Sequence, residues 1–163
     1  MNQHSFRLPS IAALAVCALM HAASAAELTG RVVRITDGDT LTVLDQAKHQ
    51  TKIRLAEIDT PEKQQPYGTR AKQALSDLVF GKDVRVETVS TDRYGRTVGR
   101  VYEGSLYVNA EMVRLGAAWV YRQYSHDPSL LRLEQEARDA RRGLWRLPEA
   151  ERVPPWEWRK EKR

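Results

Sequence analysis

The sequence predicts a domain that is mainly β with added helices: a five-stranded Greek-key barrel of the OB type, flanked by about three helices. Three observations support this fold class. The first half is rich in short β-branched segments, Asp37-Gly38 is a strong hairpin signal, and the predicted order is three strands, a helix, two strands and two helices. An open antiparallel α+β sheet is the alternative that the same order allows.

The first three strands are predicted at residues 28–36, 40–45 and 50–58, with the Asp37-Gly38 turn between the first two. Apolar residues then recur at helical spacing from 68 to 80, and Gly81 can end that helix. Strands return at 83–89 and 97–108, the latter broken by a turn at Glu103-Gly104.

Two further helices and a tail complete the prediction. Asn109 is expected to cap a short helix ending at Gly116, and a longer helix is expected within 127–143. Trp119 and Trp145 are interpreted as core residues between helix and barrel. Prolines predict an extended tail, in which Trp156 and Trp158 would point the same way.

The chain divides into three parts: a secretory signal peptide at 1–26, a barrel domain at 27–148 and an extended basic tail at 149–163. The apolar run at 11–20 is too short to span a bilayer, and small residues favour cleavage after Ala25 or Ala26. We therefore expect export to the periplasm or the medium, without stable membrane insertion. Cys17 is the only cysteine, so cleavage would exclude disulfides and cysteine chemistry.

The formal net charge of +5 suggests a polyanionic partner. Nucleic acid, an anionic membrane surface and an acidic glycan all satisfy this charge. Solvated helix faces, which many basic proteins carry, are the simpler explanation of the same composition.

Acidic residues lie where two predicted strands meet turns. Asp39 follows the hairpin glycine, and Asp59-Thr60-Pro61 ends the third strand, because proline cannot donate to a ladder. Adjacent strand ends of a barrel lie side by side. Two carboxylates and the Thr60 carbonyl would then form a hard oxygen site of the kind calcium accepts. The segment after Asp37 lacks the spacing of an EF-hand loop.

Arginines and a further carboxylate flank this acidic pair. Arg54 precedes Asp59 on the same strand, Glu62 follows it, and Arg96 lies in the turn of "TDRYGR". Guanidinium groups bind phosphate oxygens in bidentate fashion. Together these residues could bind a metal, activate a water and neutralise a phosphorane, as metal-assisted phosphodiester hydrolysis requires.

Four segments resemble the signatures of the staphylococcal nuclease (thermonuclease) family: "ITDGDTLTV", "IRLAEIDTPE", "TDRYGR" and "GLW". The resemblance runs in order from about Thr29 to Trp145. It implies a calcium-dependent endonuclease that acts on DNA and RNA and leaves 3′-phosphate products.

The resemblance also implies roles for individual residues. Asp39 and Asp59 match the calcium carboxylates, and Thr60 matches the carbonyl ligand. Arg54 and Arg96 match the phosphate-binding arginines, and Glu62 matches the general base or water-orienting group. Substrate contacts are expected from Arg93, Tyr94, Tyr124 and Tyr121. For Tyr121 and Tyr124, packing at the seam between barrel and helices is an equal alternative to substrate contact. Glu57 has no part in this scheme and is interpreted as a solvated strand residue.

Two rival functions remain compatible with the sequence. One is a non-catalytic OB-type module that binds nucleic acid, although all five catalytic positions are present. The other is an exported interaction protein that uses the "VPPWEWRK" tail. For the nuclease itself, DNA and RNA are the expected substrates and a monomer is expected.

Overall fold

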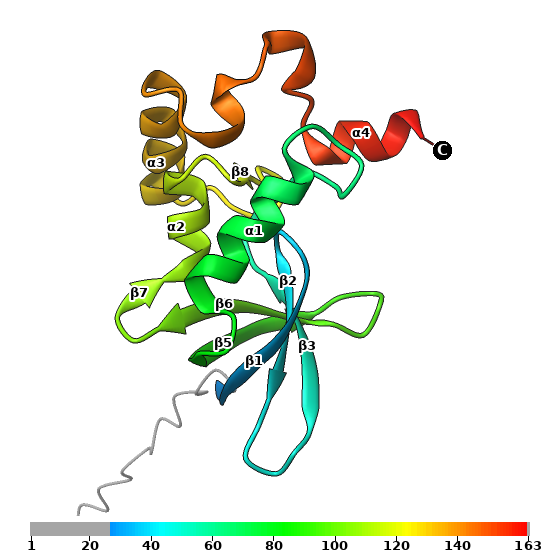
Figure 1. Ribbon diagram of the computed structural model, residues 1–163, viewed down its shortest axis with the longest axis vertical. Coiled ribbons are helices and arrows are strands. Elements are labelled where there is room, and N and C mark those ends of the chain that lie inside the picture. Colours follow the sequence, from blue (N-terminus) through cyan, green and yellow to red (C-terminus); the bar gives the residue numbers. More distant parts are fainter. Residues whose placement is uncertain (1–26, 163) are drawn as a thin grey trace, which may run out of the picture.

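A computed structural model describes residues 27–162, so the expected signal peptide lies outside the described residues. Five strands form a closed barrel in the order β3-β2-β1-β5-β6, with neighbours antiparallel and β3 and β6 closing it in parallel (Figure 1). The barrel strands are β1 (Glu27–Asp37), β2 (Thr40–Leu44), β3 (Gln50–Leu55), β5 (Asp83–Thr91) and β6 (Thr97–Glu103). The predicted barrel is confirmed, and the open sheet is wrong.

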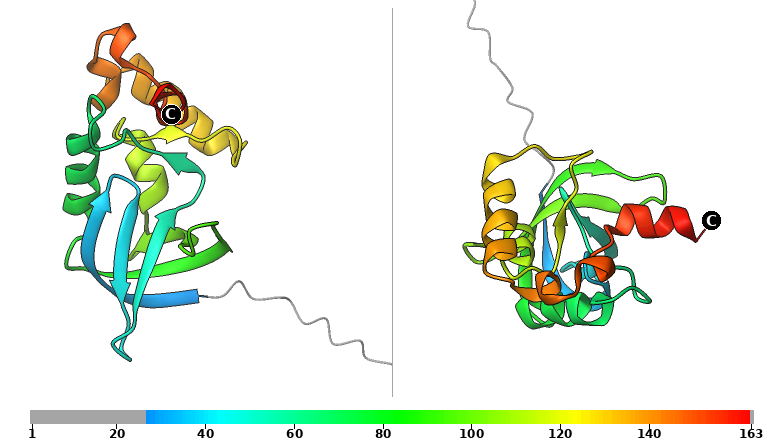
Figure 2. Two further views of the ribbon diagram at one scale, coloured as in Figure 1. Left: turned by 90° about the vertical axis from the view of Figure 1, so that its right-hand side faces the viewer. Right: turned by 90° about the horizontal axis from the view of Figure 1, so that it is seen from above.

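The remaining elements lie mostly over one end of the barrel (Figure 2). Short strands β4 (Ile58–Asp59) and β8 (Trp119–Val120) pair with each other, and β7 (Leu106–Tyr107) pairs with β6 in antiparallel orientation. The helices are α1 (Gly68–Val79), α2 (Val108–Arg114), α3 (Pro128–Asp139) and α4 (Pro155–Glu161), with 3-10 turns at Gly143–Arg146 and Glu149–Glu151. None of the helices described for residues 27–162 is long and apolar enough to cross a membrane.

The main core fills the barrel and the space beneath α1 and α2 with aliphatic side chains. Leu41, Ile53 and Val101 from the barrel pack with Leu75 of α1 and Met112 of α2. Burial of such side chains is the main stabilising contribution, at roughly 25 cal/mol per Å² of apolar surface.

A second, smaller core lies beneath α3. Trp119 and Trp145 meet edge to face there, 4.4 Å between ring centroids, and the Arg138 guanidinium lies 4.0 Å from the Trp145 ring. Both indoles are buried, which confirms the sequence interpretation.

The third predicted strand is not continuous. It stops at Leu55, turns at Ala56-Glu57 and resumes as β4, because Glu57 adopts a left-handed backbone conformation (φ 68°). The Glu57 carboxylate accepts hydrogen bonds from Arg100 Nε (2.9 Å), Tyr107 Oη (3.1 Å) and Ser125 Oγ (3.1 Å). The expectation of a solvated Glu57 is therefore wrong, since this carboxylate ties the β3–β4 turn to three other segments.

Asn109 does not cap α2, whose N-cap is Tyr107. The fully buried Asn109 side chain accepts a hydrogen bond from Val101 N and donates to the carbonyls of Ala56 and Gly99. These backbone groups belong to β6 and the β3–β4 turn, so Asn109 holds that turn against the barrel.

The extended tail is also a wrong expectation. Residues 149–151 form a 3-10 turn, and α4 begins at Pro155, where the fixed φ of proline suits the first helical position. Trp156 packs on the body of the protein: its ring stacks on Tyr121 at 5.1 Å and meets Trp119 edge to face at 6.0 Å. Helical geometry therefore separates Trp156 from Trp158.

Glu134 of α3 holds β8 in place from beneath. Its buried carboxylate accepts from Val120 N (2.9 Å), Arg122 Nη2 (2.7 Å) and Arg138 Nη2 (3.3 Å). Because β8 pairs with β4, the position of Asp59 depends on this contact.

We expect Glu134→Ala to lower the free energy of unfolding by about 1–3 kcal/mol, because the buried Val120 N–H loses its acceptor. Urea unfolding followed by circular dichroism measures this loss. Glu136→Ala, at an exposed position of the same helix, is the matched control and should change stability little. Equal stability of the two variants would contradict the role assigned to Glu134.

Candidate active site

Two buried carboxylates meet at the end of the barrel where β1, β2 and β4 have their ends. Asp39 lies in the turn between β1 and β2, and Asp59 ends β4. Asp39 Oδ2 accepts from Thr60 N (3.0 Å), and Asp39 Oδ1 accepts from Thr40 Oγ1 (3.1 Å). The predicted meeting of Asp39, Asp59 and Thr60 is thus found in the structure.

Gly38 allows this close approach. A Cβ at Gly38 would lie 2.8 Å from Thr60 Oγ1 and 2.9 Å from Ala71 Cβ, nearer than Cβ atoms come in proteins. The absence of a side chain lets the β1–β2 turn pack against α1 and places Asp39 beside Thr60.

Arg54 lies between the two carboxylates. Its Nη2 is 2.9 Å from Asp59 Oδ1 and 3.2 Å from Asp39 Oδ2, while Nη1 donates to the carbonyls of Leu55 (2.7 Å) and Ile58 (2.9 Å). Only 13% of the Arg54 side chain is exposed. Arg54 is therefore a structural bridge of the acidic site as well as the predicted phosphate ligand.

A third carboxyl group, that of Asp37, lies in the same corner and supplies no counter-charge to it. Burial, followed by the charge of Asp39, raises the pKa of Asp37 to about 7. Burial likewise raises the pKa of Asp59 to about 6, although hydrogen bonding from Arg159 and the charge of Arg54 act in the opposite direction. Asp37 was interpreted from sequence only as a turn residue, so its proximity was missed.

Arg96 lies at the rim of this corner, held by the turn between β5 and β6. Its Nε donates to Asp92 Oδ2 at 2.6 Å, and its Nη1 donates to Thr40 Oγ1 at 3.4 Å. The contact with Thr40, the neighbour of Asp39, places Arg96 beside the acidic site as predicted.

Arg93 and Tyr94 occupy the exposed tip of the same turn. Arg93 Nη2 donates to Tyr94 Oη at 2.7 Å, and the Arg93 and Arg96 guanidinium carbons lie 4.8 and 5.5 Å from the Tyr94 ring centroid. Since 68% of Tyr94 is exposed, this cluster can contact a ligand at the surface.

The two further tyrosines differ in environment. Tyr121 is covered by the stacked Trp156 ring, so its packing at the barrel–helix seam is what the structure shows. Tyr124 is 67% exposed and touches Tyr121 edge to face at 4.8 Å. Of the pair, Tyr124 has the surface that stacking on a ligand needs.

Glu62 follows β4 in the loop that leads to α1, and its side chain is 41% exposed. Gly68 lets this loop close, because a Cβ there would overlap the Glu62 carbonyl. A half-exposed carboxylate next to Asp59 can hold a water molecule, which suits the predicted role of Glu62.

Arg159 of α4 is a site residue that the sequence reasoning missed. Its Nη1 lies 2.7 Å from Glu62 Oε1, and its Nη2 lies 2.7 Å from Asp59 Oδ2. Arg159 was assigned from sequence to the extended basic tail at 149–163, and nothing local in that segment signals the contact with Asp59, which spans 100 positions.

The chemistry of the donors suits a hard divalent cation: Asp39 and Asp59 are carboxylates, and the backbone of Thr60 lies against Asp39. Arg159 occupies part of the coordination space of Asp59 in this structure. Within residues 27–162, no three His, Cys, Asp or Glu side chains are arranged to hold a metal ion. A cation here would be held by two carboxylates and completed by backbone oxygen and solvent.

The family model for the staphylococcal nuclease homologue matches residues 52–147, which include most of this site. The chain belongs to the staphylococcal nuclease family, and this class of fold and site is that of a hydrolytic nuclease.

Relatives agree along nearly the whole chain. An uncharacterized endonuclease of Escherichia coli O157:H7 is 51% identical over 84% of this chain and 88% of its own length. Protein ParB of Escherichia coli is 45% identical over 99% of this chain and 96% of its own length. A micrococcal nuclease of Shigella flexneri is 44% identical over 91% of this chain and 90% of its own length.

We expect Arg54→Ala to lower the free energy of unfolding by about 3–5 kcal/mol, because two buried carboxylates lose their shared counter-ion. Arg96→Ala, which removes a more exposed pair with Asp92, should cost about 1 kcal/mol or less. Urea unfolding in the presence of a chelator compares the two variants. Equal losses would show that Arg54 is not the bridge described above.

Proposed function

We propose that this protein is a calcium-dependent endonuclease that hydrolyses phosphodiester bonds of DNA and RNA and leaves 3′-phosphate products. The observation that carries the proposal is the gathering of Asp39, Asp59 and Glu62 with Arg54 and Arg96 at one end of the barrel. Carboxylates alone would repel a phosphodiester. The arginines and a bound cation together make the corner attractive to its oxygens.

Each residue has a task that follows from its position. Asp39, Asp59 and the Thr60 carbonyl would hold calcium, which supplies charge stabilisation at a non-bridging phosphate oxygen when bound. Glu62, half exposed, orients the attacking water and accepts its proton.

The arginines act on the phosphate. Arg96 reaches over the rim and is placed to bind the equatorial oxygens and assist the leaving oxygen. Arg54, with both terminal nitrogens engaged by protein groups, contributes positive potential from within the site and keeps the two aspartates together. The exposed Arg93–Tyr94 cluster and Tyr124 offer contacts for neighbouring nucleotides.

We expect the purified protein to cleave single-stranded DNA and RNA with calcium, to lose cleavage in excess chelator, and to recover it when calcium is restored. Calcium should also raise the unfolding temperature, because it neutralises buried carboxylates that repel one another. Gel analysis of labelled oligonucleotides and a thermal melt measure the two effects. Cleavage that survives the chelator would refute calcium dependence, whereas tight binding without cleavage would favour a non-catalytic nucleic-acid-binding module.

Arg96→Ala should lower the turnover rate by about 10²–10³, since it removes a pre-organised donor to the transition state. Glu62→Gln should lower it by about 10²–10⁴ and keep the calcium-induced rise in unfolding temperature. Single-turnover cleavage measures both, with the exposed Arg34→Ala and Glu136→Gln as controls. Near-normal rates in either site variant would remove that residue from the mechanism.

A further inference from the structure

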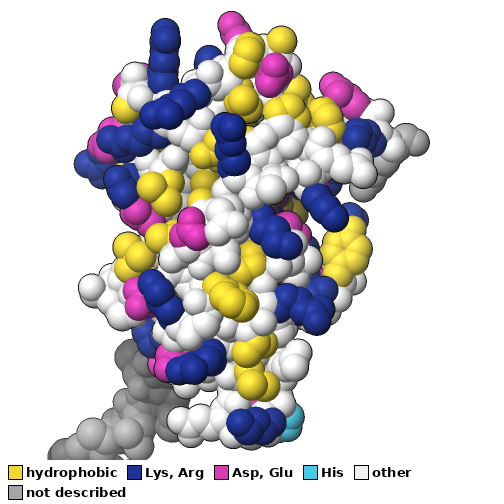
Figure 3. Space-filling model, viewed as in Figure 1, with side chains coloured by type: hydrophobic (Ala, Val, Ile, Leu, Met, Phe, Trp, Pro, Cys, Tyr) yellow, Lys and Arg dark blue, Asp and Glu magenta, His cyan; other side chains and the backbone are white. Residues whose placement is uncertain are grey.

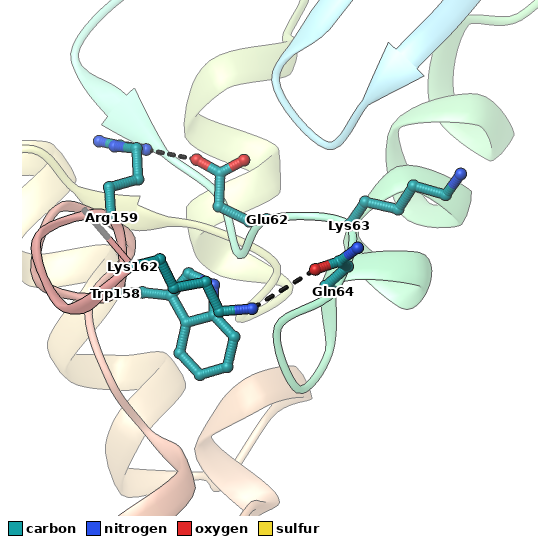
Figure 4. A pocket seen from close by; sticks show the side chains of 6 residues that line it. All are labelled: Glu62, Lys63, Gln64, Trp158, Arg159 and Lys162. Atoms are coloured by element: carbon teal, nitrogen blue, oxygen red, sulfur yellow. Dashed lines mark hydrogen bonds and ion pairs between the residues drawn. The ribbon is translucent and has the colours of Figure 1, made fainter.

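An open pocket of about 420 Å³ lies between the loop after β4 and helix α4, next to the proposed catalytic centre (Figure 4). Its volume is in the range of small-ligand sites. The loop contributes three lining residues, and α4 with its C-cap contributes the other three: Glu62, Lys63 and Gln64, then Trp158, Arg159 and the C-cap Lys162. Because α4 lies beyond residues 52–147, the family match does not account for this pocket.

Contacts at the start of α4 fix its position. Pro155 is buried, Trp156 stacks on Tyr121 in nearly parallel planes (5°), and Gln65 Nε2 donates to the Val153 carbonyl just before the helix. These contacts place the next helical turn, with Trp158 and Arg159, against the catalytic loop.

The chemistry of the pocket is cationic and aromatic. Arg159 and the exposed Lys63 and Lys162 outweigh the single carboxylate of Glu62, and Trp158 is half-buried. Lys162 Nζ lies 4.4 Å from the Trp158 ring and 3.4 Å from Gln64 Oε1. The contact with the neutral Gln64 amide is long and joins exposed side chains, so Lys162 can turn to an anionic ligand.

We propose that this pocket is a nucleotide subsite beside the scissile phosphate, in which Trp158 stacks on an unpaired base and Lys63 and Lys162 bind the adjoining phosphate. An indole plane beside cations is the combination that proteins use for single-stranded nucleic acid. In a duplex both faces of each base are already stacked, so the subsite favours single-stranded DNA or RNA. This inference rests on the proposed nuclease function.

Nucleic acid fits this pocket better than an acidic peptide because of position. Glu62, the proposed general base, lines the pocket and accepts a hydrogen bond from Arg159 (Figure 4). Arg159 also donates to Asp59. A strand whose phosphate reaches Asp59 and Glu62 can place a neighbouring nucleotide against α4, because Arg159 of α4 contacts both carboxylates. On the face shown in Figure 3, Lys and Arg side chains are spread over much of the surface, which would attract the rest of a polyanionic strand.

The test compares Trp158→Ala with the wild-type protein on a single-stranded DNA oligonucleotide, the RNA of the same sequence, and the DNA annealed to its complement. We expect KM for both single strands to rise about 5- to 150-fold, with kcat changed much less, and KM for the duplex to stay the same. Trp158→Phe should recover most of the affinity. Phe80→Ala, which removes another exposed aromatic at the end of α1, is the control.

Lys162→Gln provides an independent measurement. A plot of log KM against log salt concentration should lose a slope of about one for this variant, whereas Lys160→Gln, at an exposed position of α4, should not change the slope. For Trp158→Ala, a rise in KM for the single-stranded DNA alone or for the RNA alone would identify which single strand the subsite prefers. Either result supports the proposal.

Unchanged KM for Trp158→Ala on both single strands, or an equal rise on the duplex, would overturn the subsite. If the wild-type protein does not cleave, the nuclease proposal fails separately. Binding of labelled oligonucleotides, followed by fluorescence anisotropy, then tests the subsite. The wild-type protein should bind both single strands more tightly than Trp158→Ala by the same factor as expected for KM. Equal affinities there would overturn it, as would preferential capture of an acidic peptide.

Discussion

The shared bridge from Arg54 to Asp39 and Asp59 is the interaction on which the rest of the site depends. Two unit charges 4 Å apart repel by about 4 kcal/mol at an effective dielectric constant of 20. Buried carboxylates that both carry charge therefore need a cation beside them. Arg54 supplies that cation from β3, whose pairing with both β2 and β6 closes the barrel, so the same strand closes the fold and carries the counter-ion of the acidic corner.

The turns around that bridge are held by buried polar side chains rather than by apolar packing. Glu57 and Asn109 fasten the β3–β4 turn to β6, and Glu134 fastens β8, the partner of β4. Each carries hydrogen bonds to two or more separate segments. A turn fixed in this way keeps Asp59 and Thr60 in one position relative to Asp39, and catalytic charges need such precision, because electrostatic stabilisation depends on groups that do not have to reorganise.

Local patterns were sufficient to predict the barrel, the hairpin and the site carboxylates. Asp39 and Asp59 stand at strand ends, where a turn signal and an unexpected acid are visible within a few residues. Three residues were misjudged because most of their hydrogen-bond partners lie far away in the sequence. The partners of Glu57 are at least 43 positions away, and those of Arg159 at least 97. The partners of Asn109 lie between 8 and 53 positions away. A charged residue in a strand or tail looks solvated until the fold brings its partners to it. The prolines before α4 were ambiguous, since proline both ends extended segments and begins helices.

Arg159 shows how the charge of the corner is balanced. Oδ1 of Asp59 accepts from Arg54 and Oδ2 accepts from Arg159, so both oxygens of this carboxylate are bound by guanidinium groups. A cation held by Asp59 Oδ2, as proposed above, would compete with Arg159 for that oxygen, whereas Arg54 contacts the other oxygen. Arg159 also donates to Glu62 Oε1 at 2.7 Å, so its guanidinium would still lie at the edge of the site, where a phosphate oxygen could accept from it. The same arginine that neutralises the corner would then be available to contact the substrate.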